Sequence, residues 1–155
     1  MNKTNRLKKI IRNISSEELF GVLATSAEDV PYTNLIAFIL QDDLKKLFFA
    51  TPRDTKKFKN LTINEKVSFH IQNTKNSLED IGEAVGITIT GKASECSKKH
   101  SEEVISLYLL KHPQMKEFIY SLNTAFISVD IERYDVVERF QNVTVLKIKE
   151  QVRKL

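Results

Sequence analysis

Short apolar stretches rich in β-branched and aromatic residues alternate with polar breaks over most of the chain, a pattern typical of strands joined by turns. The first stretches form a group between residues 20 and 51, with polar turns at 27–29 and 41–43. Connections this short join antiparallel neighbours, because a parallel pair needs a crossover of about a dozen residues. We therefore expect an antiparallel meander. Its strands are predicted at 20–26, 31–40 and 46–51.

The same pattern returns further along the chain. Consecutive antiparallel strands with few helices between them favour a barrel or a sandwich over a doubly wound sheet. There is no internal repeat and no linker, so the sequence predicts one mainly β domain over residues 1–155, with six to seven mostly antiparallel strands. The later strands are predicted at 67–71, 85–93, 125–131 and 143–148.

Three segments depart from strand spacing. Apolar residues recur at helical intervals near the N-terminus, and the polar run 15–18 indicates a break followed by a new turn of helix. Asp54 is a competent N-cap for a short helix that begins there. Residues 104–119 again follow helical spacing, and Pro113 within them predicts a kinked helix or a helical hairpin.

Composition narrows the class of protein. With 155 residues, of which 41% are hydrophobic and 28% charged, the chain can bury a core and is not of disordered type. Cys96 is the only cysteine, which excludes an intrachain disulfide and a site of paired thiolates and favours a reducing, cytoplasmic compartment. The N-terminus lacks the apolar run of a signal peptide, and no window approaches the ~18 apolar residues of a membrane span, so we expect a soluble protein.

The net charge of +4 raises the question of a nucleic-acid partner. The lysines occur as short pairs separated by acidic residues, and aromatic residues are not interleaved with them, as base-stacking surfaces require. We therefore predict no nucleic-acid binding. The pairs are Lys8 and Lys9, Lys45 and Lys46, Lys56 and Lys57, and Lys98 and Lys99.

One lysine pair has a special position, between a predicted strand and the start of a predicted helix. The first amides of a helix have no intrahelical acceptor, and the helix dipole adds positive potential, so anions bind there. Lys56 and Lys57 add two ammonium groups, and the hydroxyl of Thr51 or Thr55 can donate a further hydrogen bond. By itself this pattern is also typical of an ordinary exposed helix start.

The order of the segments between residues 20 and 72 gives this pattern its context. The runs LATSAEDVPYTNLIAFIL, LFFATPRDTKKFKNL and KVSFHI follow one another. In this order they resemble the FMN-binding split-barrel family related to pyridoxamine 5′-phosphate oxidase. The resemblance implies a split β-barrel in which Thr51, Thr55, Lys56 and Lys57 hold the phosphate of FMN. It also implies that the strand of Asn34, Leu35 and Ile36 lies along the isoalloxazine ring and the ribityl chain.

The resemblance further implies a flavin-dependent oxidoreductase for a small molecule, working as a homodimer with FMN at the subunit interface. One departure argues against activity on pyridoxamine phosphate itself: the chain has no tryptophan, and its C-terminal residues 150–155 do not match the segment in which the family enzyme carries a tryptophan and substrate-binding arginines. Two further departures concern the cofactor. Asn34 replaces an arginine and Gly86 replaces a glutamine that commonly faces the flavin, which implies a looser hold on the cofactor or a different cofactor. A non-enzymatic protein that binds flavin, deazaflavin or haem stays open as the alternative.

The histidines form no metal site by their spacing, because no two of them are paired at helical or hairpin intervals. His70 is expected to be a neutral core or barrel-rim residue, while His100 and His112 are expected at a helix end or on the surface. A single histidine can still bind haem iron. No metal site is therefore predicted.

Overall fold

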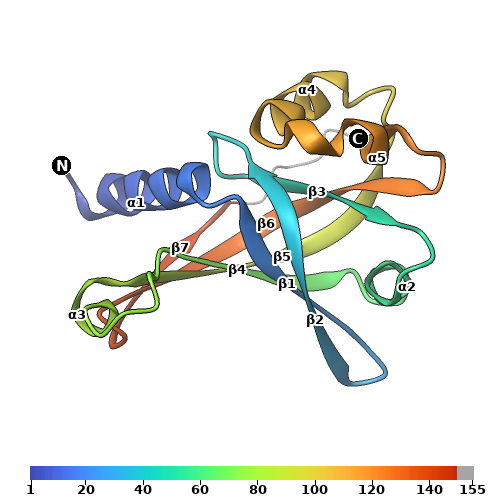
Figure 1. Ribbon diagram of the computed structural model, residues 1–155. Helices are drawn as coiled ribbons and strands as arrows, with labels where there is room; N and C mark the ends of the chain where they lie inside the picture. Colours follow the sequence, from blue (N-terminus) through green and yellow to red (C-terminus); the bar gives the residue numbers. More distant parts are fainter. Residues whose placement is uncertain (150–155) are drawn as a thin grey trace.

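The computed structural model describes residues 1–149 and has seven antiparallel strands in the order β3-β2-β1-β4-β5-β6-β7 (Figure 1). An additional pairing of β3 with β6 closes the first six of these strands into a barrel. The mainly β fold and the strand number are thereby confirmed. The strands are β1 (Phe20–Ala27), β2 (Val30–Leu40), β3 (Lys46–Pro52), β4 (Lys66–Gln72), β5 (Val85–Cys96), β6 (Thr124–Glu138) and β7 (Asn142–Lys147).

Strand β6 is twice as long as the sequence suggested. Its first half pairs with β3 and its second half with β7, while β5 accompanies it along nearly its whole length. The charged residues after Ile131 look like the end of a strand, yet β6 continues with one extra residue, Glu132, at a register shift against β5. Alternation then resumes in the other phase, because Tyr134 and Val136 point into the barrel and are fully buried. The polar side chains between them lie on the outer face, which makes the extension compatible with a hydrophobic core.

The barrel interior is filled by aromatic and aliphatic side chains from all six barrel strands. Phe38 and Phe69 meet edge to face, with ring centroids 4.9 Å apart, and Tyr134 donates a hydrogen bond from its hydroxyl to the Leu44 carbonyl at 2.7 Å. A buried tyrosine hydroxyl needs such a partner. The largest fully buried core residues include Leu23, Phe38, Leu47, Phe49, Phe69, Ile71, Ile87 and Tyr134.

Helix α1 (Lys3–Glu17) lies against the barrel and contributes Leu7, Ile11 and Ile14 to the same core. The predicted break at residues 15–18 is wrong, since the helix runs without interruption to Glu17. The hydroxyl of Ser15 donates to the Arg12 carbonyl at 3.1 Å, which satisfies this polar group within the helix.

A second, smaller core covers the outer side of β3 and β6. It contains Phe48 and Phe126, whose rings stack 5.5 Å apart, together with side chains of α4 (Glu102–Lys111) and α5 (Lys116–Tyr120). The short 3-10 turn η1 (Pro113–Met115) separates these helices, which confirms the predicted interruption at Pro113. The remaining helices are α2 (Lys56–Ile63) and α3 (Asp80–Glu83). Among the residues that the structure describes, no helix has the length and apolar character needed to cross a membrane.

Candidate anion-binding site

The turn from β3 into α2 is built around two threonines. Thr55 is the N-cap of α2, because its Oγ1 accepts from the backbone N–H of Phe58 at 3.3 Å, and its hydroxyl lies 2.8 Å from the Pro52 carbonyl. The hydroxyls of Thr51 and Thr55 lie 3.1 Å apart. The predicted N-cap, Asp54, is therefore wrong by one residue. The Asp54 carboxylate instead accepts from the Asn123 amide at 3.3 Å.

Helix α2 is fastened to β1 near the end of the barrel. The buried Asn60 donates from its Nδ2 to the Thr25 hydroxyl at 3.1 Å, and Asn64 donates to the Ser26 hydroxyl at the same distance. Leu61 packs into the main core. These contacts fix the N-terminus of α2, where the N–H groups of the first residues have no intrahelical acceptor. Figure 1 shows the helix at the end of the sheet, beside β1 and β2.

Lys56 and Lys57 stand at this N-terminus without a carboxylate partner. In the part of the chain that the structure describes, neither takes part in an ion pair. Lys56 is exposed, and its Nζ lies 4.8 Å from the centre of the Tyr32 ring. Lys57 is half-buried, and this burial lowers the pKa of its ammonium group, an effect that Tyr32 partly offsets. Two uncompensated cations at a helix N-terminus suit an anionic ligand.

Strand β2 contributes Asn34 from its inner face. The strand register pairs Asn34 with Leu23 and Tyr32 with Thr25, so Asn34 and Tyr32 share the face that lies toward α2. Asn34 Oδ1 is buried and has no hydrogen-bond partner within residues 1–149. A buried amide oxygen without a partner is rare in folded proteins. This orphaned oxygen makes Asn34 a candidate hydrogen-bond partner for a ligand.

The side chains of Leu35 and Ile36 do not join this group. Leu35 points to the outer face of the barrel and is 71% exposed, while Ile36 belongs to the core and is 6% exposed. The sequence resemblance assigned a role to the backbone of this segment, and here the structure shows an open edge. β2 pairs with β3 only from Phe38 to Leu40, so within the described residues no strand pairs with the β3-side edge of residues 31–36. Alternate N–H and C=O groups point outward from such an edge.

Tyr32 was missed as a site residue by the sequence reasoning. A strand places residues i and i+2 on one face, so the spacing of Tyr32 and Asn34 held the signal. The spacing alone did not identify Tyr32, because its contact with Lys56 joins β2 to α2. The packing of α2 against this face of β2 had to be known first.

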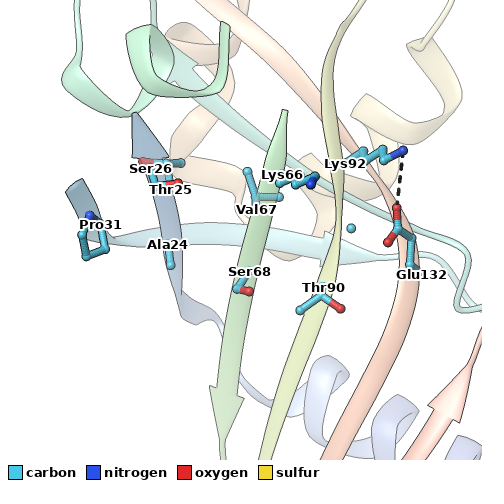
Figure 2. Close-up of a pocket in the computed structure, with 11 residues that line it drawn as sticks. Ala24, Thr25, Ser26, Pro31, Lys66, Val67, Ser68, Thr90, Lys92 and Glu132 are labelled. Carbon is cyan, nitrogen blue, oxygen red and sulfur yellow. Dashed lines mark ion pairs between the residues drawn. The ribbon is translucent and has the colours of Figure 1, made fainter. Parts of the chain in front are cut away.

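A separate hollow of about 420 Å³ lies on the outer face of the sheet, across β1, β4 and β5 (Figure 2). Its floor consists of small side chains, and its rim carries Lys66 and an ion pair between Lys92 and Glu132 at 3.9 Å. None of the predicted site residues lines it. The small floor residues are Ala24, Ser26, Ser68, Thr90 and Gly91.

The histidines lie outside the anion site. His70 faces outward from β4, where Nε2–H donates to Gln72 Oε1 at 3.1 Å and Nδ1 lies 3.3 Å from the Thr88 hydroxyl. The expectation of a helix-end or surface position holds only in part for His112. It caps the C-terminus of α4, but it is 4% exposed and donates from Nε2 to the Phe38 carbonyl at 2.8 Å. Among residues 1–149 no group of three His, Cys, Asp or Glu side chains is arranged to hold a metal ion.

The family model described as pyridoxamine 5′-phosphate oxidase matches residues 7–138. No sequence among curated proteins matches the chain. A putative pyridoxamine 5′-phosphate oxidase from Listeria innocua shares the fold with a TM-score of 0.66 and 19% identity, over 84% of this chain and 98% of that one. A FAD-binding protein from Mesorhizobium loti does so with a TM-score of 0.65 and 13% identity, over 81% of this chain and 89% of that one.

A haem-binding protein from Mycobacterium smegmatis has the same fold with a TM-score of 0.79 and 15% identity. The match covers 90% of this chain but only 57% of that protein, so the chain spans little more than half of its length. Sequence identities this low show that the proteins share a fold. The ligand named for one of these proteins does not thereby become the ligand of this chain.

Proposed function

The chain belongs to the pyridoxamine 5′-phosphate oxidase family, and on that premise we propose that it is a flavoprotein that binds FMN by its phosphate and serves as an oxidoreductase for a small molecule. The observation that carries this proposal is the pair of cations at the start of α2. Lys56 and Lys57 have no carboxylate partner among the described residues, and Lys57 is partly desolvated. Partial burial of a charged group costs free energy, and a counter-charge on a bound ligand offsets that cost.

The chemistry of FMN fits the donors at this place. Its phosphate is a dianion near neutral pH and matches two ammonium groups together with the free amides of α2. Thr55 is half-buried and its hydroxyl can turn toward this phosphate, while Thr51 is fully buried and would act through its hydroxyl contact with Thr55 at 3.1 Å. Asn34 can accept through its buried Oδ1 and donate through Nδ2, which suits a ligand with ribityl hydroxyls beside a phosphate.

The open edge of β2 would serve the rest of the cofactor. The outward N–H and C=O groups of residues 31–36 can bond the polar rim of a planar ring system, as Leu35 and Ile36 were expected to do through their backbone. Bound FMN supplies hydride or single-electron transfer, and the chain binds and orients it. The departures at Asn34 and Gly86 concern the cofactor, and we expect them to loosen its binding. The C-terminal departure at residues 150–155 lies outside the described residues.

We also propose that two copies associate through the outer face of β1 and β2, with the cofactor at their interface. Val22 and Leu35 are cross-strand neighbours on this face, both are exposed, and Phe20 is exposed beside them. Apolar side chains gathered on a sheet face are typical of a protein interface. We further propose that the protein works in the reducing cytoplasm, a compartment that its single cysteine, Cys96, favours.

Haem is the alternative that one observation favours, namely the shared fold with a haem-binding protein. An axial ligand to iron needs a free ring nitrogen. His112 is buried with Nε2 bound to a carbonyl, and both ring nitrogens of His70 have hydrogen-bond partners. His100 is exposed and lies between β5 and α4. No histidine therefore belongs to β2 or to the turn from β3 into α2, and these elements support flavin better than haem.

The test is the visible absorbance of the purified protein, followed by titration with FMN and with riboflavin, which lacks the phosphate. We expect a flavin spectrum and tighter binding of FMN than of riboflavin. Lys56→Ala combined with Lys57→Ala should weaken FMN binding by roughly tenfold or more per lysine, since a charged hydrogen bond contributes about 1.5–3 kcal/mol. Riboflavin binding should stay unchanged.

Lys59→Ala is the matched control, because Lys59 is an exposed lysine on the same helix beyond its first turn. Equal FMN affinity in the double variant and the control would contradict the proposed phosphate site. A Soret band in place of the flavin spectrum would select haem.

A further inference from the structure

Tyr32 connects β2 with the charged start of α2. Its side chain is half-buried on the face of β2 that it shares with Asn34, two residues further along the strand. The ammonium group of Lys56 lies over its ring, 4.8 Å from the centroid. The ring face carries partial negative charge, and a cation within about 6 Å of it is attracted.

This contact restrains a side chain that would otherwise be free. Lys56 is exposed on the first turn of α2 and has no ion-pair partner within residues 1–149. An unrestrained lysine loses about 2 kcal/mol of rotamer entropy when a ligand immobilises it. An ammonium group has three N–H donors, so one side can stay against the ring while another donates to a phosphate oxygen.

The strand that carries Tyr32 is held against α2 independently of Lys56. It stands directly opposite Thr25 in the β1–β2 ladder, and Thr25 accepts the hydrogen bond from Asn60 of α2. The same link therefore sets the distance between the strand that carries the ring and the helix that carries the lysine. The ring and the ammonium group meet because the two elements are fixed to each other.

We propose that Tyr32 is a positioning residue of the phosphate site, whose ring holds Lys56 ready to bind the terminal phosphate of the ligand. This inference rests on the proposed function and goes beyond it, since it assigns the affinity for the phosphate partly to an aromatic ring. The ring acts through Lys56, so its contribution vanishes when either the phosphate or Lys56 is removed.

The experiment compares Tyr32→Leu and Tyr32→Phe with the wild type, in titrations with FMN and with riboflavin. Tyr32→Leu should weaken FMN binding by roughly two- to fivefold, the range expected of an exposed cation–π contact. Tyr32→Phe keeps the ring and should bind FMN close to the wild type. Both variants should bind riboflavin like the wild type.

The decisive comparison repeats Tyr32→Leu in a Lys56→Ala background. There the substitution should no longer change FMN affinity, because a double-mutant cycle isolates the energy of the contact between two residues. A structural role of the ring would persist in this background and would weaken riboflavin binding as well, and either result overturns the inference. Full FMN affinity in Tyr32→Leu overturns it too.

Failure of the proposed function gives a different pattern. If the wild type binds FMN no more tightly than riboflavin, phosphate recognition itself is absent and both proposals fall. If FMN is preferred and Lys57→Ala abolishes the preference while Tyr32→Leu has no effect, the phosphate site stands and only the role of Tyr32 is rejected.

Discussion

At the scale of single residues, Lys111 carries a charge into the contact between α4, α1 and β2. Its ammonium group donates to the Ser15 carbonyl at 2.7 Å and lies 3.9 Å from the centre of the Phe38 ring. Burial lowers the pKa of Lys111 to about 8, and the nearby Glu18 only partly offsets this. The last turn of α1 has no basic residue of its own, so a lysine from another helix provides the cation there.

This environment predicts a pH dependence of stability. Between pH 8 and the ordinary lysine value of 10.5 the unfolded chain holds a proton on Lys111 that the folded chain has released. Lys111 should therefore make the free energy of unfolding rise with pH in this window, and Lys111→Met should give a smaller slope than the wild type. Urea unfolding from pH 7.5 to 10 measures it.

The exposed Lys116→Met is the control for this scan and should keep the wild-type slope. The scan ends near pH 10, because burial raises the pKa of Tyr108 and Tyr134, which makes stability fall above that point. Identical slopes in Lys111→Met and the wild type would show that Lys111 keeps its ordinary proton affinity.

At the scale of elements, the β5–β6 pair depends on a register shift between Thr90 and Gly91. A Cβ at Gly91 would lie 2.2 Å from the Asp130 carbonyl oxygen, which is backbone and cannot turn away. The close approach of the two strands therefore requires glycine here. Such an irregularity re-aims the strands of a barrel and lets the sheet close.

Gly91→Ala should consequently destabilise the fold by about 3 kcal/mol or more, since strands must separate to admit the methyl group. The matched control is Gly82→Ala in α3, where a Cβ would have nothing within 4 Å. That control should change stability by less than about 1 kcal/mol. Thermal unfolding of both variants measures the difference, and equal midpoints would refute the close approach.

The sequence predicted which strands and helices form better than it predicted the residues at which they begin and end. Alternation located the barrel strands, but it failed after Ile131, because the extra residue Glu132 puts the inward Tyr134 and Val136 out of phase with the preceding half of β6. The N-cap was placed at Asp54, whereas Thr55 forms it, since both residue types cap helices well and only the turn after Pro52 decides between them. Serines that suggest a break can also bond within a helix, as Ser15 does.

The residues of the candidate site also differ in how far the sequence could predict them. Thr51, Thr55, Lys56 and Lys57 are close in sequence, so the resemblance could assign them as one group, and their role in holding a phosphate stays a prediction. Asn34 needed the resemblance, because it lies on another strand, far from the turn in sequence. The contact of Tyr32 with Lys56 could not be predicted, because it depends on how α2 packs against β2 in three dimensions.

At the scale of the whole molecule, the outer face of β1 and β2 is the surface that the proposed homodimer uses. Leu35→Asp places a charge at its most exposed apolar position, opposite Val22. We expect sedimentation velocity to show a dimer for the wild type and a monomer for this variant, because burying an unpaired carboxylate costs several kcal/mol. FMN retention should fall with the dimer.

Leu122→Asp is the control for this surface. Leu122 is 95% exposed and lies in the turn between α5 and β6, away from β1 and β2. This variant should remain dimeric. A monomeric wild type, or a dimer that survives Leu35→Asp, would refute the assigned interface.

The open edge of β2 has a further consequence for the protein before it meets a ligand. Unpaired N–H and C=O groups along residues 31–36 form a template on which a strand of another molecule can add. Strand-by-strand growth of this kind leads to insoluble assemblies. A ligand bound as proposed would cover the edge left open within residues 1–149, so we expect the solubility of the protein to rise when the ligand is supplied.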